Sequence, residues 1–263
     1  MIRQPANVFA NDSAHDYALA LGDDALVMAQ RMGEWIASAP QIEEDIALGN
    51  LALDQLGQAR TLLSYAGSLS EPLRTEDDLA YLRDAADFRN VVFVERPWGP
   101  GRPDFGVAMA RLLVLSTYQW LLYDDLRSST DATLAAIAAK AVKEVDYHRD
   151  HAKLWVLRLG DGTEESHLRM QAAVDAEWPY VEELFDGSFV HPALLDEGVA
   201  VDPTSLRAAV LDRLASVLAE ATLELPDVTP AASGGRRGEH TDHLTELLAD
   251  MQGLARTHQG ATW

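Results

Sequence analysis

The residues best suited to chemistry lie in the middle of one long helical pattern, residues 131–159. Glu144 and His148 are four positions apart, so a helix places this carboxylate and this imidazole one turn from each other. Tyr147 and His151 flank them. Inside a helical core, a carboxylate and an imidazole must hydrogen-bond, ionise as a pair or bind a metal ion. The pattern therefore raises the question of a metal centre.

A carboxylate-bridged di-iron centre needs more ligands than this chain supplies. In a ferritin-like bundle, two helices each provide a Glu, and the other two each provide Glu-x-x-His, because positions three apart share a helix face. Here the residue three positions after Asp54 is Gly57, and the residue three positions after Glu144 is Tyr147. A third helix offers Gln119 where an acid is needed. The sequence therefore disfavours a di-iron site in this chain.

The four positions closest to the di-iron pattern have a structural alternative. We expect them to pair with one another inside the bundle. Glu144 and His148, which lie one helical turn apart, are expected to form a buried pair. On this interpretation the chain has no catalytic, cofactor-binding or metal-binding residue. The four positions are Glu34, Asp54, Glu144 and His148.

Four helical patterns would position these residues. The fourth carries an apolar stripe at spacings of three and four, with Asp131 as a candidate N-cap and Gly160 after its last periodic residue. The stripe consists of Leu134, Ala138, Ala141, Val145, His148, Ala152 and Trp155. The four patterns cover residues 12–38, 42–69, 104–127 and 131–159.

The second helical pattern is apolar on nearly every side, which predicts burial on most sides. Gly49 and Gly57 interrupt it, and each costs roughly 1 kcal/mol of helix stability relative to alanine. We expect that a neighbouring helix approaches closely at these glycines.

The order of the patterns predicts an all-α fold. Two helical hairpins are joined by a long connection, residues 70–103, which is the arrangement of a ferritin-like four-helix bundle. The connection is expected to hold a short helix near 77–84 and an extended piece after residue 90. We expect a single domain, residues 1–263, with a loose arm at residues 1–12, a core bundle at 12–160 and additional helices at 161–263. The additional helices are expected at 164–185, 203–224 and 241–257.

The C-terminal region contains two further polar motifs. Arg236 and Arg237 lie between glycines and either meet an anion or a partner carboxylate, or belong to a solvated loop. The sequence leaves the role of this loop, Gly234–Gly238, open. His240 and His243 have metal-like spacing but lie at a helix start, where Thr and Asp are good caps, so we favour capping.

Composition excludes several classes of function. The net charge is −21, which argues against nucleic acid and anionic membranes as partners. The chain has no cysteine, so disulfides, thiolate metal sites and thiol nucleophiles are excluded. The N-terminal residues do not resemble a signal peptide, and we expect no apolar run long enough to span a bilayer. The expected location is the cytoplasm.

Several long blocks of sequence, in order, resemble the C-subunit family of the phenylacetyl-CoA 1,2-epoxidases, also called ring-oxygenating phenylacetate-CoA oxygenases. The resemblance covers residues 17–263. The blocks are LGDDALVMAQRMGEW, IALGNLALDQLGQARTLLSYAG, AAKAVKEVDYHRDHAKLWVLRLGDGTEES, EGVAVDP and GGRRGEHTDHL.

The resemblance implies a non-catalytic structural subunit of a multicomponent oxygenase in aerobic phenylacetate breakdown. The implied partner is a related ferritin-like A subunit that holds the di-iron centre. The implied electron source is an NADPH-dependent reductase with FAD and an iron–sulfur cluster. Two alternatives remain open from the residues: a di-iron enzyme in its own right, and a helical adaptor unrelated to oxygenation.

Overall fold

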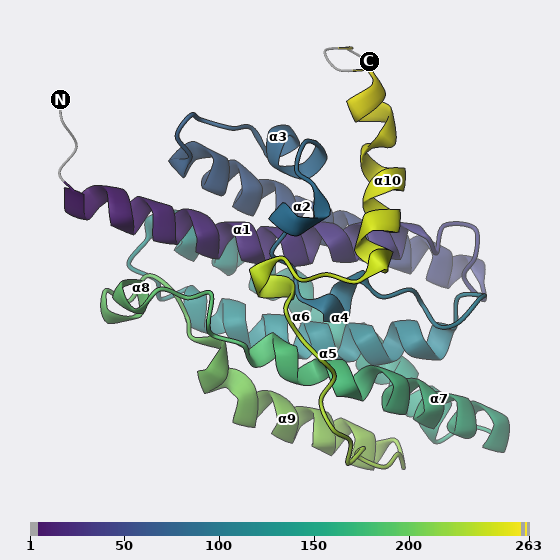
Figure 1. Ribbon diagram of the computed structural model, residues 1–263. Helices are drawn as coiled ribbons and strands as arrows, with labels where there is room; N and C mark the ends of the chain where they lie inside the picture. The colour runs from purple at the N-terminus through teal and green to yellow at the C-terminus, as the bar shows by residue number, and fades with distance from the viewer. Residues whose placement is uncertain (1–4, 259–260, 262–263) are drawn as a thin grey trace.

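A computed structural model describes residues 5–258 and residue 261. This part of the chain folds into ten α-helices and three short 3-10 helices, without a β-strand. Four long helices form the bundle and pack as two hairpins, α1 with α2 and α5 with α6 (Figure 1). The ferritin-like all-α prediction is confirmed. The bundle helices are α1 (Pro5–Gly33), α2 (Ile42–Leu69), α5 (Phe105–Leu126) and α6 (Ala132–Gly160).

Local signals located two of these helices closely. α2 has the predicted bounds, and α6 begins one residue after Asp131. The Asp131 carboxylate accepts hydrogen bonds from the backbone N–H groups of Thr133 and Leu134, at 2.8 and 2.9 Å, as an N-cap does. Six of the seven stripe residues on α6 are buried, whereas Trp155 is only partly buried.

Helix α1 differs from the prediction at both ends. It begins at Pro5, so residues 5–11 are helical and not a loose arm; residues 1–4 lie outside the described residues. It ends at Gly33, and the chain then turns, with Ala37 at a φ of 61°. The apolar period continues to Trp35 because Trp35 packs into the core from this turn. A periodic residue beyond the end of a helix made the predicted helix too long.

Helix α2 is buried on one side only, so the prediction of burial on most sides is wrong. Leu48, Leu51 and Leu62 face the core, whereas Ile46 and Leu53 are 61% and 64% exposed. No atom outside the local backbone lies within 4 Å of a Cβ built at Gly49. Among the residues that the structure describes, therefore, no helix approaches closely at Gly49.

The connection between the hairpins contains more helix than expected. α3 begins with a capping box: the Thr75 side chain accepts a hydrogen bond from the Asp78 backbone N–H, and the Asp78 carboxylate accepts one from the Thr75 backbone N–H. The segment predicted to be extended forms a buried turn of helix at Phe93. The elements are α3 (Glu76–Tyr81), η1 (Ala85–Asp87) and α4 (Val92–Glu95).

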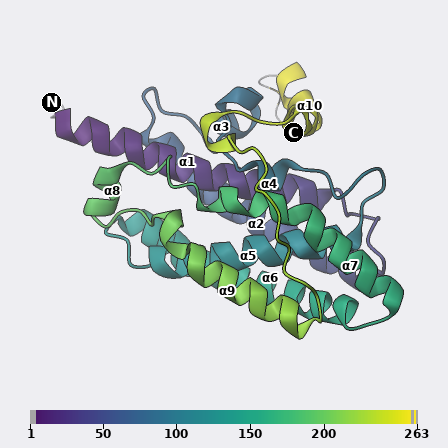
Figure 2. The same ribbon diagram turned by 60° about the horizontal axis from the view of Figure 1, so that its bottom comes forward.

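The additional helices cover two sides of the bundle. α7 and α9 pack on α5 and α6, whereas α10 packs beside α3, α4 and α1 (Figures 1 and 2). The predicted helix 164–185 is divided at Trp178, since Pro179 follows and the backbone continues as a 3-10 helix. The elements are α7 (Glu164–Glu177), η2 (Trp178–Phe185), α8 (Pro192–Asp196), α9 (Pro203–Glu220), η3 (Gly235–Arg237) and α10 (Asp242–Thr257).

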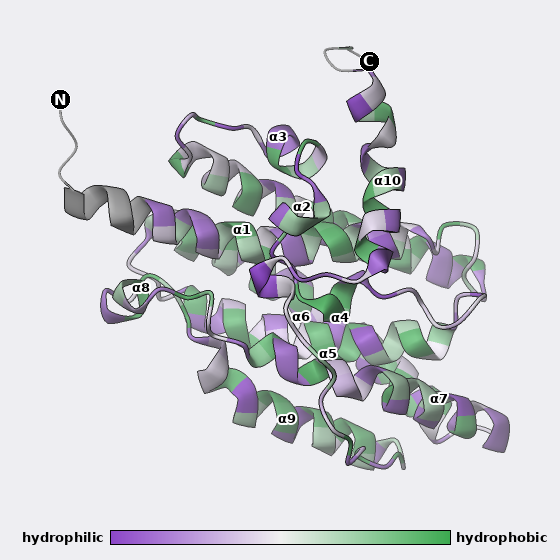
Figure 3. Ribbon diagram, viewed as in Figure 1, coloured by the Kyte–Doolittle hydropathy of each residue, from purple (hydrophilic) through white to green (hydrophobic). Residues whose placement is uncertain are grey.

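One long helix, α5, is mostly apolar and mostly buried. α5 is long and apolar enough to cross a membrane by length and composition, contrary to the sequence-based expectation, but 83% of that apolar stretch is buried inside the bundle. The other long helices show hydrophobic and hydrophilic residues in alternation, as expected for helices with one buried side (Figure 3). α5 is therefore the central helix of the core.

The Gly-Arg motif anchors the C-terminal segment to α1. Arg236 is buried: its guanidinium contacts the Asp24 carboxylate at 2.7 Å and donates to the carbonyl oxygens of Ala20 and Arg89. A Cβ at Gly235 would lie 2.1 Å from the Asn90 carbonyl oxygen, so only glycine allows this approach. The solvated-loop alternative is thus wrong for Arg236.

The neighbouring histidine motif is also used structurally. The His240 imidazole contacts the Glu95 carboxylate at 2.7 Å, and the Thr241 hydroxyl donates to the same carboxylate at 2.8 Å. Thr241 is the N-cap residue of α10 but makes no capping hydrogen bond with its side chain, so the capping prediction is wrong in this detail. The motif joins the start of α10 to the end of α4.

Candidate functional site

The four candidate positions do not converge on one point. Glu34 lies in the turn after α1, where its exposed carboxylate pairs with Arg31 at 2.5 Å. The other three, Asp54, Glu144 and His148, lie where α2 and α6 meet. The prediction that all four pair inside the bundle is therefore wrong for Glu34, because the helix that was expected to carry it has already ended.

His148 and Glu144 each find a partner on α2 and not each other. The fully buried His148 imidazole contacts the Asp54 carboxylate at 3.1 Å. Glu144 accepts a hydrogen bond from Gln58 at 3.1 Å and forms an ion pair with Lys140 at 3.0 Å. The predicted Glu144–His148 pair is therefore wrong. α2 offers an acid to the imidazole and an amide to the carboxylate, and these contacts across the helices replace the contact along α6.

A third pair of polar side chains also joins α2 to α6. The Glu44 carboxylate and the His151 imidazole lie 3.1 Å apart, and both side chains are largely buried. We call the three pairs the polar ladder. Numbers rise along α2 while they fall along α6, as expected for antiparallel neighbours. The pairs are Glu44–His151, Asp54–His148 and Gln58–Glu144.

Two amides occupy the centre of the bundle. The Gln55 and Gln119 side chains hydrogen-bond to each other at 2.9 and 3.3 Å, and both are buried. Gln119 stood out in the sequence, whereas Gln55, Gln58 and Glu44 were missed. Their shared signal was present: all three interrupt the apolar face of α2 that also carries Leu51.

The donor set does not fit a carboxylate-bridged di-iron centre. Gln55 and Gln119 are neutral and use their amides on each other, while Lys140 offsets the charge of Glu144. Among the residues that the structure describes, no group of three or more His, Asp and Glu side chains is close enough to share a metal ion. Iron in such a centre requires a mostly carboxylate cage. The arrangement can support hydrogen bonding across the helices but offers no such cage.

The pKa values of His148 and His240 are shifted in opposite directions. Burial lowers the pKa of His148, and its hydrogen bond to Asp54 offsets this only in part. Burial would also lower the pKa of His240, but hydrogen bonds to Glu95 and to the Phe88 carbonyl oxygen outweigh it, so this pKa is raised. The polar ladder thus contains a neutral imidazole at neutral pH, whereas the contact with Glu95 favours a protonated one.

We expect His148→Gln to reduce the loss of stability in mild acid. Below about pH 6.5 the unfolded chain binds a proton at His148 that the folded chain, with its lowered pKa, resists. The stabilisation is therefore present above pH 6.5 and falls as pH drops toward the folded pKa. Urea unfolding from pH 7.5 to 5 measures this effect, with the 45% exposed His243 as the matched control in His243→Gln. If the free energy of unfolding fell equally with pH in wild type and in His148→Gln, the lowered pKa of His148 would be contradicted.

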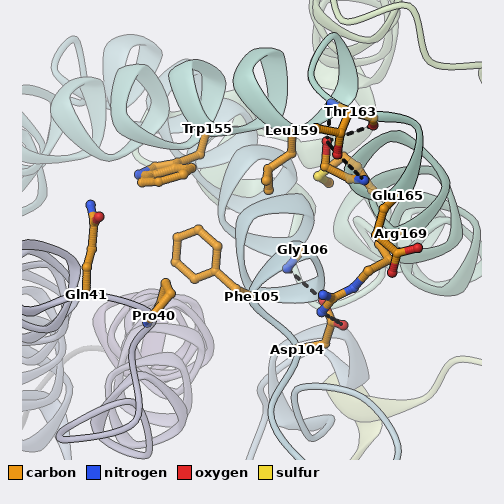
Figure 4. Close-up of a pocket in the computed structure, with 12 residues that line it drawn as sticks. Pro40, Gln41, Asp104, Phe105, Gly106, Trp155, Leu159, Thr163, Glu165 and Arg169 are labelled. Carbon is orange, nitrogen blue, oxygen red and sulfur yellow. Dashed lines mark hydrogen bonds and ion pairs between the residues drawn. The ribbon is translucent and has the colours of Figure 1, made fainter.

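A pocket of about 320 Å³ lies at one end of the bundle (Figure 4). Trp155 and Phe105 meet edge to face at 5.0 Å on its wall, and Leu159 lies beside them. Gln41 borders it on the α2 side, and the Arg169–Asp104 ion pair, at 2.8 Å, lies near its rim. Its lining is mostly apolar, so it suits an apolar group of side-chain size.

Comparison with known proteins matches residues 3–263 to a family model described as phenylacetic acid catabolic protein. The chain is also similar to the C subunit of the 1,2-phenylacetyl-CoA epoxidase of Escherichia coli (strain K12). The two are 44% identical over 247 residues, which cover 94% of this chain and 98% of that relative.

Proposed function

Since the chain belongs to the phenylacetic acid catabolic protein family, we propose that it is the C subunit of a phenylacetyl-CoA epoxidase in phenylacetate catabolism. The similarity that supports this role extends over nearly the full length of both chains. On this proposal the substrate is a phenylacetyl-CoA thioester, and the epoxidation takes place in a complex of several subunits.

Within that complex we propose a non-catalytic role. The observation that carries it is the polar core where α2, α5 and α6 meet. Gln55 and Gln119 bond each other there, and the polar ladder pairs Asp54 with His148 and Gln58 with Glu144, so these side chains form no carboxylate cage for iron. The di-iron centre belongs to a related A subunit, and a reductase with NADPH, FAD and an iron–sulfur cluster supplies electrons. This chain pairs with the A subunit, in the cytoplasm, and stabilises it.

Two alternatives make different predictions. A di-iron enzyme in its own right would need iron bound at Asp54, Glu144 and His148, the candidate positions that lie together. An adaptor unrelated to oxygenation would have no affinity for an A subunit. Iron content separates the proposal from the first alternative, and association separates it from the second.

We expect the chain to co-purify with a co-expressed A subunit and to contain far less than one iron per chain when purified alone. The first result follows from the proposed pairing and the second from the donor set of the polar ladder. The measurement is affinity purification through a tag on this chain, followed by iron analysis of the complex and of the isolated chain.

Glu144→Ala tests the iron alternative, with Glu34→Ala as its control because Glu34 lies outside the bundle core. Stoichiometric iron in the isolated chain that is lost only in Glu144→Ala would establish the di-iron enzyme. A chain that purifies without the A subunit would instead support the adaptor.

A further inference from the structure

The outward side of α2 carries an apolar stripe that nothing in the described part of this chain covers. Ile42, Ile46 and Leu53 are 71%, 61% and 64% exposed, and Leu56 is 38% exposed. With Gly49 these positions are separated by four, three, four and three residues, a spacing of 3.5 that holds a stripe against a partner helix. The open space at Gly49 lets a second backbone approach closely in the middle of the stripe.

Helix α6 extends this surface beyond the polar ladder. Tyr147 and Leu154 are seven residues apart and are 58% and 67% exposed. α7 and α9 pack on another side, against α5 and α6 (Figures 1 and 2), whereas Tyr81 of α3 and Met251 of α10 border the stripe in a shared groove but leave Ile46 and Leu53 exposed. We call this surface the α2–α6 face; its exposed apolar residues are Ile42, Ile46, Leu53, Tyr147 and Leu154.

The pocket of Figure 4 lies between the start of α2 and the later part of α6, and α5 and α7 also contribute to its lining. Gln41, which borders the pocket, precedes the exposed Ile42, and Trp155, which forms its wall, follows the exposed Leu154. Protein interfaces concentrate binding energy where a large side chain of one partner enters an apolar pocket of the other. A pocket of about 320 Å³ at the end of an apolar stripe fits that description.

Charge argues against a second copy of this chain as the occupant. Each copy carries a net charge of −21, so two copies repel each other. The acids Glu43, Asp54 and Asp150 lie on the two helices of the face together with the exposed Lys140 and Lys143, so it is the net charge of the whole chain that opposes self-association. A partner that matches the face has its own helical apolar stripe.

We propose that the α2–α6 face is the docking surface for the catalytic subunit of the epoxidase, which contributes a helical apolar stripe and inserts one large apolar side chain into the Trp155 pocket. This inference rests on the proposed function, which requires a second subunit. α2 has 28 residues and spans roughly 42 Å, which is long enough for a stable interface of roughly 2,000 Å² between two bundles.

The test replaces exposed apolar residues with glutamate and measures binding to the catalytic subunit. Leu53→Glu on α2 and Leu154→Glu on α6 are each expected to weaken binding roughly tenfold or more, because each places an unpaired charge in a desolvated interface. Leu225→Glu is the matched control, since Leu225 is 52% exposed and follows α9 on another side of the bundle. Thermal unfolding of each isolated variant verifies that it remains folded.

The possible outcomes distinguish a failure of the proposed docking surface from a failure of the proposed function. Binding by the wild type that Leu53→Glu and Leu154→Glu leave unchanged, or that Leu225→Glu weakens equally, overturns the α2–α6 face and leaves the proposed function intact. No binding by the wild type overturns the proposed function and this partner together. A wild-type homodimer that Leu53→Glu converts to a monomer identifies a second copy as the occupant and overturns the proposal.

Discussion

Replacing Arg236 by alanine is expected to lower the free energy of unfolding by about 3–5 kcal/mol, because it leaves a buried charge without its partner. Asp24 is 4% exposed, and burial raises the pKa of its carboxyl even with Arg236 beside it. The substitution also removes the hydrogen bonds that tie the C-terminal segment to the carbonyl oxygens of Ala20 and Arg89. The C-terminal segment at Arg236 would then lose its hydrogen bonds to α1 and to the connection at Arg89.

Arg237→Ala is the control for this prediction. The Arg237 side chain is 51% exposed, so its removal is expected to change stability by no more than about 0.5 kcal/mol. Urea unfolding of both variants gives the comparison. A double variant, Asp24→Asn with Arg236→Met, is expected to recover part of the loss, because it removes both buried charges. Equal effects of Arg236→Ala and Arg237→Ala would show that the buried pair contributes nothing specific.

The four-helix plan could be predicted from the sequence because its signals are local. The apolar period and the Asp131 cap lie within a few residues of the structure that they specify, and α2 has the predicted bounds. The partner of Arg236 lies 212 residues away on α1, and nothing near either residue indicates the pair. Local pattern therefore located the helices but not the contacts that join the additional helices to them.

The candidate site shows the same limit on a smaller scale. The spacing of Glu144 and His148 permits a contact along α6. In the structure Glu144 instead bonds Gln58 of α2, and His148 contacts Asp54 of α2. Spacing within one helix gives the pairs that can form, and the neighbouring helix decides which of them do form.

The apolar character of α2 was recognised, but its burial was predicted wrongly. Sequence pattern does not distinguish a residue buried within its own chain from one that another chain covers. Leu53 and Ile46 satisfy the pattern of a buried helix and are nevertheless exposed in this chain. Such a disagreement between pattern and structure is what a surface made for a partner produces.

Omitting this chain from the reconstituted epoxidase is expected to reduce epoxidation to background. A protein that folds against a partner loses stability when the partner is absent, and a partner at 100 times its Kd contributes about 2.7 kcal/mol. A catalytic subunit without this chain would lose that stabilisation and would expose the apolar surface that meets the α2–α6 face. The effect is on assembly, so it does not require any ligand from the polar ladder.

The contrast between a role in assembly and a role in binding iron gives the most direct test of the chain's non-catalytic but necessary role. Phenylacetyl-CoA-dependent NADPH oxidation and epoxide formation are measured with the catalytic subunit and reductase alone, then with wild-type chain, then with a folded Glu144→Ala chain. We predict background activity in the first case and equal, full activity in the other two, since the proposed function gives Glu144 no iron to hold. Full activity without this chain, or failure of Glu144→Ala to restore activity although it forms the complex, would contradict that role.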